Sequence, residues 1–113
     1  FGFIDTMPEA MAASDLVVAK AGGLTVAEAV GRGVPLVLYH VIPGQERLNA
    51  QYVSAHGAAL MAKSPAEVAA AVRRCLEHPE QLAAMRDAAK TISHPDAALR
   101  IVAEVVAPLL LVR

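Results

Sequence analysis

Two adjacent glycines, Gly22 and Gly23, separate the apolar run at residues 16–19 from a segment of helical periodicity that begins near Leu24. This order predicts a helix N-terminus directly after the carboxyl end of a strand. The unpaired N–H groups and partial positive charge of a helix N-terminus favour an anion such as a phosphate. We therefore expect a phosphate-binding turn here, with an ordinary flexible turn as the alternative.

Thr25 and Glu28 extend this candidate site along the start of the helix. They lie about one helical turn apart, so both side chains can face one ligand. A carboxylate repels a phosphate, and its more natural partner is a neutral diol such as a ribose. Glu28 is thus a candidate ribose contact, or alternatively a solvated surface residue. Lys20 either neutralises diphosphate charge or is a solvated lysine at the strand end.

A second polar group, Gln45, Glu46 and Asn49, follows a Pro-Gly turn at residues 43–44. Gln45 and Asn49 have the spacing that puts two side chains on one face of a helix. Amide groups both donate and accept hydrogen bonds, which suits sugar hydroxyls. The alternative is a polar helix face on which Asn49 anchors a loop.

The elements that must position these residues follow from hydrophobic patterning. Apolar runs at residues 1–4, 16–19, 35–39 and 58–62 predict buried strands, and helices are predicted between them at 7–13, at 24–32 and up to Gly57. Alternation of strand and helix predicts a doubly wound α/β fold, a parallel sheet with helices on both faces. Ligands of such sheets bind at the strand carboxyl ends, where residues 20–25 and 40–46 converge.

Beyond residue 63 the sequence is helical. Ser64 and Glu67 have capping-box spacing before a helix that ends near His78, and further helices are predicted from Pro79 and over residues 97–106. The first of these helices presents four residues to the core: Val68, Val72, Cys75 and Leu76. The apolar stretch at residues 105–112 is too short to span a bilayer and too apolar to leave in water.

Composition restricts the function further. A chain of 113 residues with 56% hydrophobic and 19% charged residues fits one domain, and its net charge of -1 without a basic run argues against nucleic acid. The single cysteine, Cys75, is interpreted as a core residue. No apolar run approaches the roughly 18 residues of a membrane span, and no signal peptide is visible. The default expectation is a cytoplasmic protein.

Three ordered motifs carry a resemblance to a known family: GFIDTMPEAMAASDLVV at residues 2–18, GGLTVAEA at 22–29 and PGQERLN at 43–49. They resemble the carboxyl-terminal domain of lipid-acceptor glycosyltransferases, glycosyltransferase family 28, which have the GT-B fold. This family includes monogalactosyldiacylglycerol synthases and processive diacylglycerol glucosyltransferases. More distantly, it includes the enzyme that completes the second lipid intermediate of peptidoglycan. The likeness runs from residue 1 to about 62. Ala21 departs from the family, which often has Pro there, so the loop shape is open.

The resemblance implies that the chain binds the donor, a UDP-sugar, through residues of all three motifs. In the family the Phe-Ile-Asp segment meets the uracil ring, so Ile4 and Met7 become base-contact candidates, with ordinary strand and helix-start residues as the alternative. Gln45 and Glu46 are assigned to the hexose, and Asn49 to the same neighbourhood. The complete candidate donor site is Ile4, Met7, Gly22, Gly23, Leu24, Thr25, Glu28, Gln45, Glu46 and Asn49.

The resemblance further implies an inverting hexosyltransferase of glycolipid biosynthesis that transfers hexose to a lipid hydroxyl such as diacylglycerol. Galactose, glucose and N-acetylglucosamine all remain open. No Asp-x-Asp pair occurs, so we expect neither a metal nor another cofactor. The general base belongs to the amino-terminal domain of the family, which also receives the lipid, so we expect no catalytic residue and no activity in this chain alone. The full-length enzyme is expected at the cytoplasmic membrane face as a peripheral protein.

We expect a single truncated domain over residues 1–113: a motif region at 1–62 and a helical tail at 63–113. Its apolar end would normally cross onto the amino-terminal domain, which predicts self-association of the isolated piece. Two other classes of protein are alternatives to this family. The spacing of Gly22, Gly23 and Glu28 fails the dinucleotide fingerprint. A non-catalytic flavodoxin-like interaction or signalling domain fits in size, but explains neither the Gly-Gly-Leu-Thr motif nor the cluster at 45–49.

Overall fold

The computed structural model describes residues 2–111 and contains a three-stranded parallel sheet. The strands are β1 (Val17–Ala19), β2 (Leu36–Tyr39) and β3 (Ala59–Ala62), in the order β1-β2-β3. Val18 pairs with Val37, which pairs in turn with Leu60. Because the strands are parallel, all three carboxyl ends lie at one edge of the sheet. Three of the four predicted strands are thereby confirmed.

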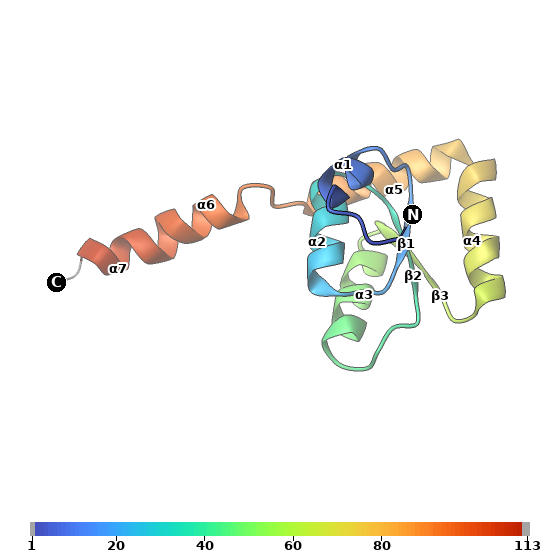
Figure 1. Ribbon diagram of the computed structural model, residues 1–113, viewed down its shortest axis with the longest axis horizontal. Helices are drawn as coiled ribbons and strands as arrows, with labels where there is room; N and C mark the ends of the chain where they lie inside the picture. Colours follow the sequence, from blue (N-terminus) through green and yellow to red (C-terminus); the bar gives the residue numbers. More distant parts are fainter. Residues whose placement is uncertain (1, 112–113) are drawn as a thin grey trace.

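Helices cover both faces of this sheet (Figure 1). The crossover helices α2 (Gly23–Gly31) and α3 (Gln45–Ala55) lie on one face, and α4 (Pro65–Glu77) lies on the other, against β2 and β3. A short helix, α1 (Met7–Ala12), packs on α2. This arrangement confirms the predicted doubly wound α/β fold, consistent with the Rossmann-like half of a GT-B protein.

Helix α5 (Pro79–Ile92) closes the amino edge of the sheet. Lys90 of α5 lies against Gly33, just before β2, and Ala88 lies against Gly57, just before β3. Both glycines have positive φ angles, 68° and 84°, which a side chain would strain. Since α5 occupies the amino edge, the carboxyl edge faces the loops that follow β1 and β2.

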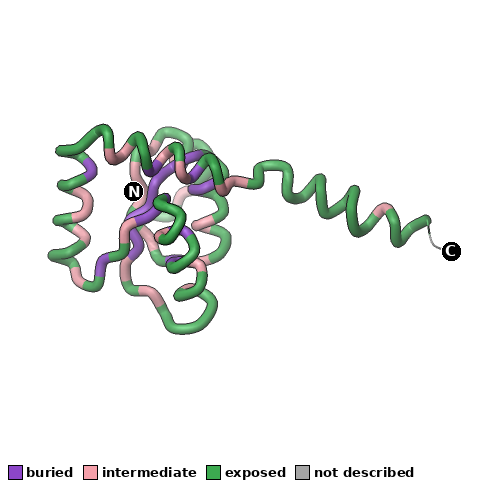
Figure 2. Tube along the Cα trace, turned by 180° about the vertical axis from the view of Figure 1, so that it is seen from behind, coloured by how far each residue is buried: buried purple, intermediate pink, exposed green. Residues whose placement is uncertain are grey.

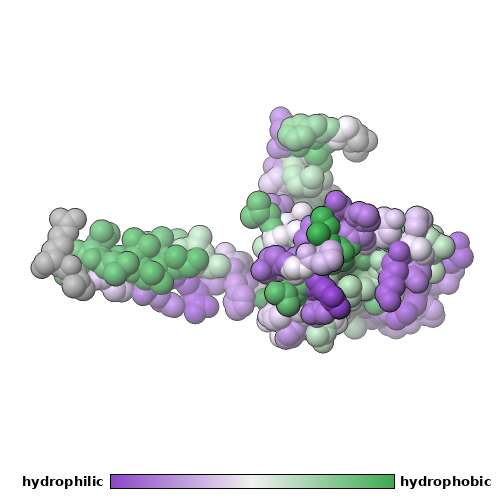
Figure 3. All heavy atoms as spheres, turned by 90° about the horizontal axis from the view of Figure 1, so that it is seen from below, coloured by the Kyte–Doolittle hydropathy of each residue, from purple (hydrophilic) through white to green (hydrophobic). Residues whose placement is uncertain are grey.

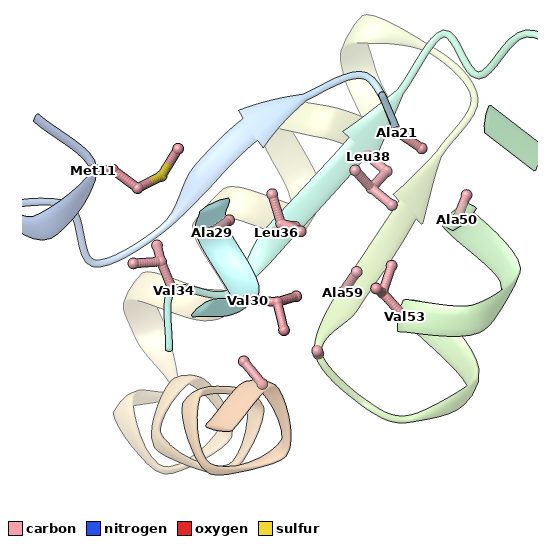
Figure 4. Close-up of a cluster of buried hydrophobic side chains, with 12 residues drawn as sticks. Met11, Ala21, Ala29, Val30, Val34, Leu36, Leu38, Ala50, Val53 and Ala59 are labelled. Atoms are coloured by element: carbon pink, nitrogen blue, oxygen red, sulfur yellow. The ribbon is translucent and has the colours of Figure 1, made fainter. Parts of the chain in front are cut away.

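The core lies between the sheet and the pair α2 and α3 (Figure 4). Leu36 and Leu38 of β2 are fully buried there against Ala29 and Val30 of α2 and Val53 of α3. The apolar β2 residue between the two leucines is also buried and alternates to the opposite face. A central strand buried on both faces explains why the run 35–39 shows no polar alternation.

The carboxyl-terminal helix extends away from this domain (Figures 1 and 2). It comprises α6 (Ala97–Ile101), a π-helical turn η1 (Val102–Val106) and α7 (Ala107–Leu111). From residue 97 to 111, every residue except Ala107 is exposed. Its hydrophobic residues lie along one side, as Figure 3 shows. The extension explains a radius of gyration of 16.1 Å, against about 13 Å for a compact chain of this length.

Three predictions about elements were wrong. Residues 2–4 form no strand and Phe3 is 99% exposed, whereas Phe1 lies outside the described residues. Leu76 was assigned to the core but is 66% exposed, because α4 buries Cys75 instead. The last helix does not end near Val106. It continues past Pro108, which lacks the N–H of an α-helical bond, and the wider π turn lies directly before it.

Candidate functional site

The Gly-Gly turn forms the N-terminus of α2, as predicted. Gly22 is the N-cap with an extended backbone, φ -62° and ψ 141°, and no side chain caps the helix. The first hydrogen bond of the helix runs from the N–H of Val26 to the carbonyl of Gly22, at 3.0 Å. The N–H groups of Gly23, Leu24 and Thr25 precede it and have no helical carbonyl to bond. These donors can bind an anion.

Space above this turn is open. A Cβ atom built on Gly22 would meet no atom within 4 Å, and one on Gly23 would meet only Asn49 Nδ2, at 3.9 Å. Packing therefore does not require glycine at either position. The absence of side chains instead leaves the backbone donors of the turn uncovered, as contact with a ligand requires.

Asn49 joins the two motifs. Its Nδ2 donates a hydrogen bond of 2.9 Å to the carbonyl of Ala21, immediately before the glycines. Its Oδ1 accepts a bond of 3.1 Å from Gln45 Nε2, one turn earlier on α3. Gln45, Asn49 and the start of α2 thus lie together at the carboxyl edge of the sheet. Asn49 is partly buried, and its bond to Ala21 anchors the loop that precedes α2. In this structure it therefore has the loop-anchoring geometry that was the alternative to a sugar contact.

Glu46 fixes the loop that precedes α3. Its Oε2 accepts a hydrogen bond of 2.9 Å from the N–H of Ile42. Between them Gly44 adopts φ 103° and ψ -131°, a conformation open in practice only to glycine. The Pro-Gly-Gln-Glu sequence therefore builds a tight loop that carries Gln45 on its rim, with the side chain exposed.

Glu28 lines a groove between α2 and α3 that the end of α5 and the segment at residues 94–97 also line. The cavity there has a volume of about 520 Å³, and its rim includes Gly23, Leu24 and Asn49. Leu24 is 82% exposed at the mouth. Thr25 is half-buried and does not line the groove. Tyr52 of α3 also lines it, a residue that sequence reasoning missed although it lies one turn beyond Asn49.

Ile4 and Met7 are not brought together with the other eight candidate residues. Ile4 is half-buried ahead of α1, and Met7 is the exposed first residue of that helix. Helix α1 instead buries Met11 in the core cluster with Ala29 and Val34, towards the far end of α2 (Figure 4). Among residues 2–111, no hydrogen bond links Ile4 or Met7 with the Gly-Gly turn, and neither residue lines the groove that contains Glu28.

The single cysteine, Cys75, has a structural role. Cys75 is fully buried, and this burial raises the pKa of its thiol, an effect that the positive charge of Arg74 partly offsets. The interpretation of Cys75 as a core residue is confirmed. In the described part of the chain, no group of three His, Cys, Asp or Glu side chains could hold a metal ion. None of its helices is long and apolar enough to cross a bilayer.

Comparisons with known proteins give this geometry a context. The family described as "Glycosyltransferase family 28 C-terminal domain" matches residues 1–101. Processive diacylglycerol beta-glucosyltransferases of Bacillus cereus (strain AH187) and Bacillus anthracis (strain A0248) are each 35% identical over 107 residues, 95% of this chain and 28% of the relative. That of Bacillus thuringiensis (strain Al Hakam) is 35% identical over 102 residues, 90% and 26%. The chain thus spans about a quarter of the length of these curated relatives.

Proposed function

Because the chain belongs to the glycosyltransferase family 28 C-terminal domain family, we propose that it is the donor-binding part of an inverting glycosyltransferase. The donor is a UDP-sugar, and the hexose passes to a lipid hydroxyl such as that of diacylglycerol. The observation that carries the proposal is the hydrogen bond from Asn49 to Ala21, which holds the phosphate-binding turn beside the amide cluster of α3. Because the family match covers residues 1–101, we no longer retain the alternative of a non-catalytic flavodoxin-like domain.

In this proposal the diphosphate lies at the N-terminus of α2. The free N–H groups of Gly23, Leu24 and Thr25 bind its oxygens, and the helix dipole favours its charge. During transfer the acceptor oxygen forms the new glycosidic bond, and negative charge grows on the diphosphate as the bond between its oxygen and the anomeric carbon breaks. Backbone donors fixed in advance stabilise that charge without rearrangement. No metal ion is needed for this step.

Glu28 and the α3 cluster bind the neutral parts of the donor. Glu28, at the rim of the groove, accepts hydrogen bonds from the ribose hydroxyls. Gln45 bonds Asn49 through its Nε2 atom, so its Oε1 remains available as an acceptor for a hexose hydroxyl. One carboxylate oxygen of Glu46 accepts the N–H of Ile42, and its other oxygen is available to a hexose hydroxyl. The uracil contacts of Ile4 and Met7 stay a prediction that rests on the resemblance alone.

The acceptor proposal rests on the relatives. The matched Bacillus proteins are named as processive diacylglycerol beta-glucosyltransferases. We assign the base and the lipid site to sequence outside this chain, in an enzyme that acts at the cytoplasmic face of the membrane. The 113 residues alone are then inactive.

A transfer assay on the complete protein tests this function. UDP-glucose, UDP-galactose and UDP-N-acetylglucosamine, each labelled in the sugar, are offered with vesicles that contain diacylglycerol, with and without EDTA. We expect a labelled glycolipid with one donor and an equal rate in EDTA. Hydrolysis or no reaction with all three donors would contradict the glycolipid proposal, and full inhibition by EDTA would contradict the metal-free step.

A further inference from the structure

A second cavity, of about 460 Å³, lies at the carboxyl ends of β2 and β3. His40 follows β2 and Lys63 follows β3, and the pairing of Tyr39 with Ala62 puts these two residues at adjacent ends of neighbouring strands. Arg47, in the first turn of α3, lines the same cavity. Its volume lies within the roughly 300–1,000 Å³ of small-molecule sites.

This cavity is separate from the groove that contains Glu28. On α3, Arg47 and Gln51 line the second cavity, whereas Asn49 and Tyr52 line the groove. These two pairs of positions belong to different faces of one helix. The start of α3 therefore separates two sites with different chemistry, an amide cluster on the α2 side and basic side chains on the β3 side.

The charge of the second cavity is unbalanced. None of its lining residues is acidic, and among residues 2–111 neither Arg47 nor Lys63 takes part in an ion pair. The nearby carboxylates of Glu46 and Glu67 do not line it, and each accepts a backbone N–H, from Ile42 and Lys63 respectively. Two basic side chains and an imidazole thus line one cavity without an acidic residue.

The backbone conformation of His40 also indicates a binding site at this cavity. His40 has φ 56° and is the one non-glycine residue of the described chain with a positive φ. Such a conformation is strained for a residue with a side chain and persists where the surroundings hold it, often at binding sites. Val41, Pro43 and Met61 form an apolar wall beside the basic groups.

We propose that this cavity binds a phosphate group, either a free phosphate or the phosphate of a lipid headgroup whose apolar part lies on that wall. Arg47 and Lys63 supply charge-assisted hydrogen bonds to the phosphate oxygens, and His40 supplies a ring N–H. This site goes beyond the proposed donor site and shares none of its assigned residues.

The test uses the complete protein and two charge-matched variants. Arg47→Gln/Lys63→Gln removes two charges from the cavity, and Arg32→Gln/Arg73→Gln removes two exposed charges that line neither site. Inorganic phosphate is titrated while backbone amide NMR shifts are followed, and vesicles of phosphatidylcholine with and without phosphatidylglycerol are sedimented with each protein. UDP binding is measured in parallel to report on the donor site independently.

We expect the cavity variant to lose about tenfold or more of its affinity for phosphate or for phosphatidylglycerol vesicles. The control variant should lose less than twofold, and UDP binding should be unchanged in both. Loss of phosphate binding identifies the free anion as a ligand. Loss confined to phosphatidylglycerol vesicles identifies a lipid headgroup. If neither ligand depends on Arg47 and Lys63, or if the control loses as much, the proposal is overturned, whatever the result for UDP.

Discussion

At the scale of single residues, Glu28 carries the clearest prediction. Glu28→Ala in the complete protein should weaken UDP-sugar binding by about 1.5–3 kcal/mol, because a charged acceptor of the ribose hydroxyls is lost. Isothermal titration calorimetry measures this change. Glu77→Ala, an exposed carboxylate on α4, is the matched control and should leave affinity unchanged. Equal affinity of Glu28→Ala and wild type would reject the ribose role.

A second prediction concerns Asn49, which holds the Gly-Gly turn through the carbonyl of Ala21. Asn49→Ala removes the 2.9 Å bond that ties α3 to the Gly-Gly turn, so it should lower the free energy of unfolding by about 1 kcal/mol and also weaken UDP binding. Gln45→Ala keeps that bond and should affect stability less. Urea unfolding with calorimetry separates the two effects. Unchanged stability of Asn49→Ala would show that the bond does not hold the turn.

The residues of the site were only partly predictable. Gly22, Gly23, Gln45 and Asn49 were found because turn glycines and amides at helical spacing leave a local signal. The contact between Asn49 and Ala21 spans 28 positions, which no local pattern encodes. Likewise His40, Arg47 and Lys63 lie on three separate segments. Only the fold brings them around one cavity.

At the scale of elements, the cap of α4 can be tested alone. The Oγ of Ser64 accepts the N–H of Glu67 at 3.2 Å, and the Glu67 carboxylate returns a bond to the N–H of Lys63. Ser64→Ala should cost about 1 kcal/mol of unfolding free energy. Ser93→Ala, at the end of α5 without a cap bond to its side chain, is the control. A cost no larger than that of the control would contradict the capping role.

The sequence predicted helices and strands correctly where a local pattern is compatible with only one kind of element. The apolar run 35–39 became β2 because it is buried on both faces, and the side-chain cap of Ser64 marks the start of α4. The run 1–4 has similar composition, but a strand also needs a neighbour. In the described chain β1 is an edge strand that pairs only with β2, and Phe3 is exposed. Apolar composition indicates a tendency to be buried and not the partner that buries it.

At the scale of the whole molecule, the carboxyl-terminal helix leaves a continuous apolar side in water. Leu99, Val102 and Leu109 are 76%, 55% and 69% exposed, whereas Arg100 and Glu104 pair with each other. We predict that the 113-residue chain self-associates through this side, because large contiguous apolar patches are uncommon on monomeric proteins in water. Analytical ultracentrifugation over a range of concentrations measures the mass.

Two variants sharpen this prediction. Val102→Glu/Leu109→Glu places charges on the apolar side and should restore a monomer without loss of domain stability, because no residue from 97 to 111 is buried. Glu104→Gln changes the polar pair only and should still associate. A wild-type chain that stays monomeric at high concentration would contradict the prediction.

The central claim is that the turn at residues 22–25 and the cluster at 45–49 form one donor site. An amide NMR titration of the complete protein with UDP, and with ADP as the control nucleotide, tests it most directly. The account predicts shifts at Gly22 to Glu28 and at Gln45 that are larger with UDP than with ADP. Binding of UDP that leaves these amides unshifted, or no binding of UDP at all, would contradict it.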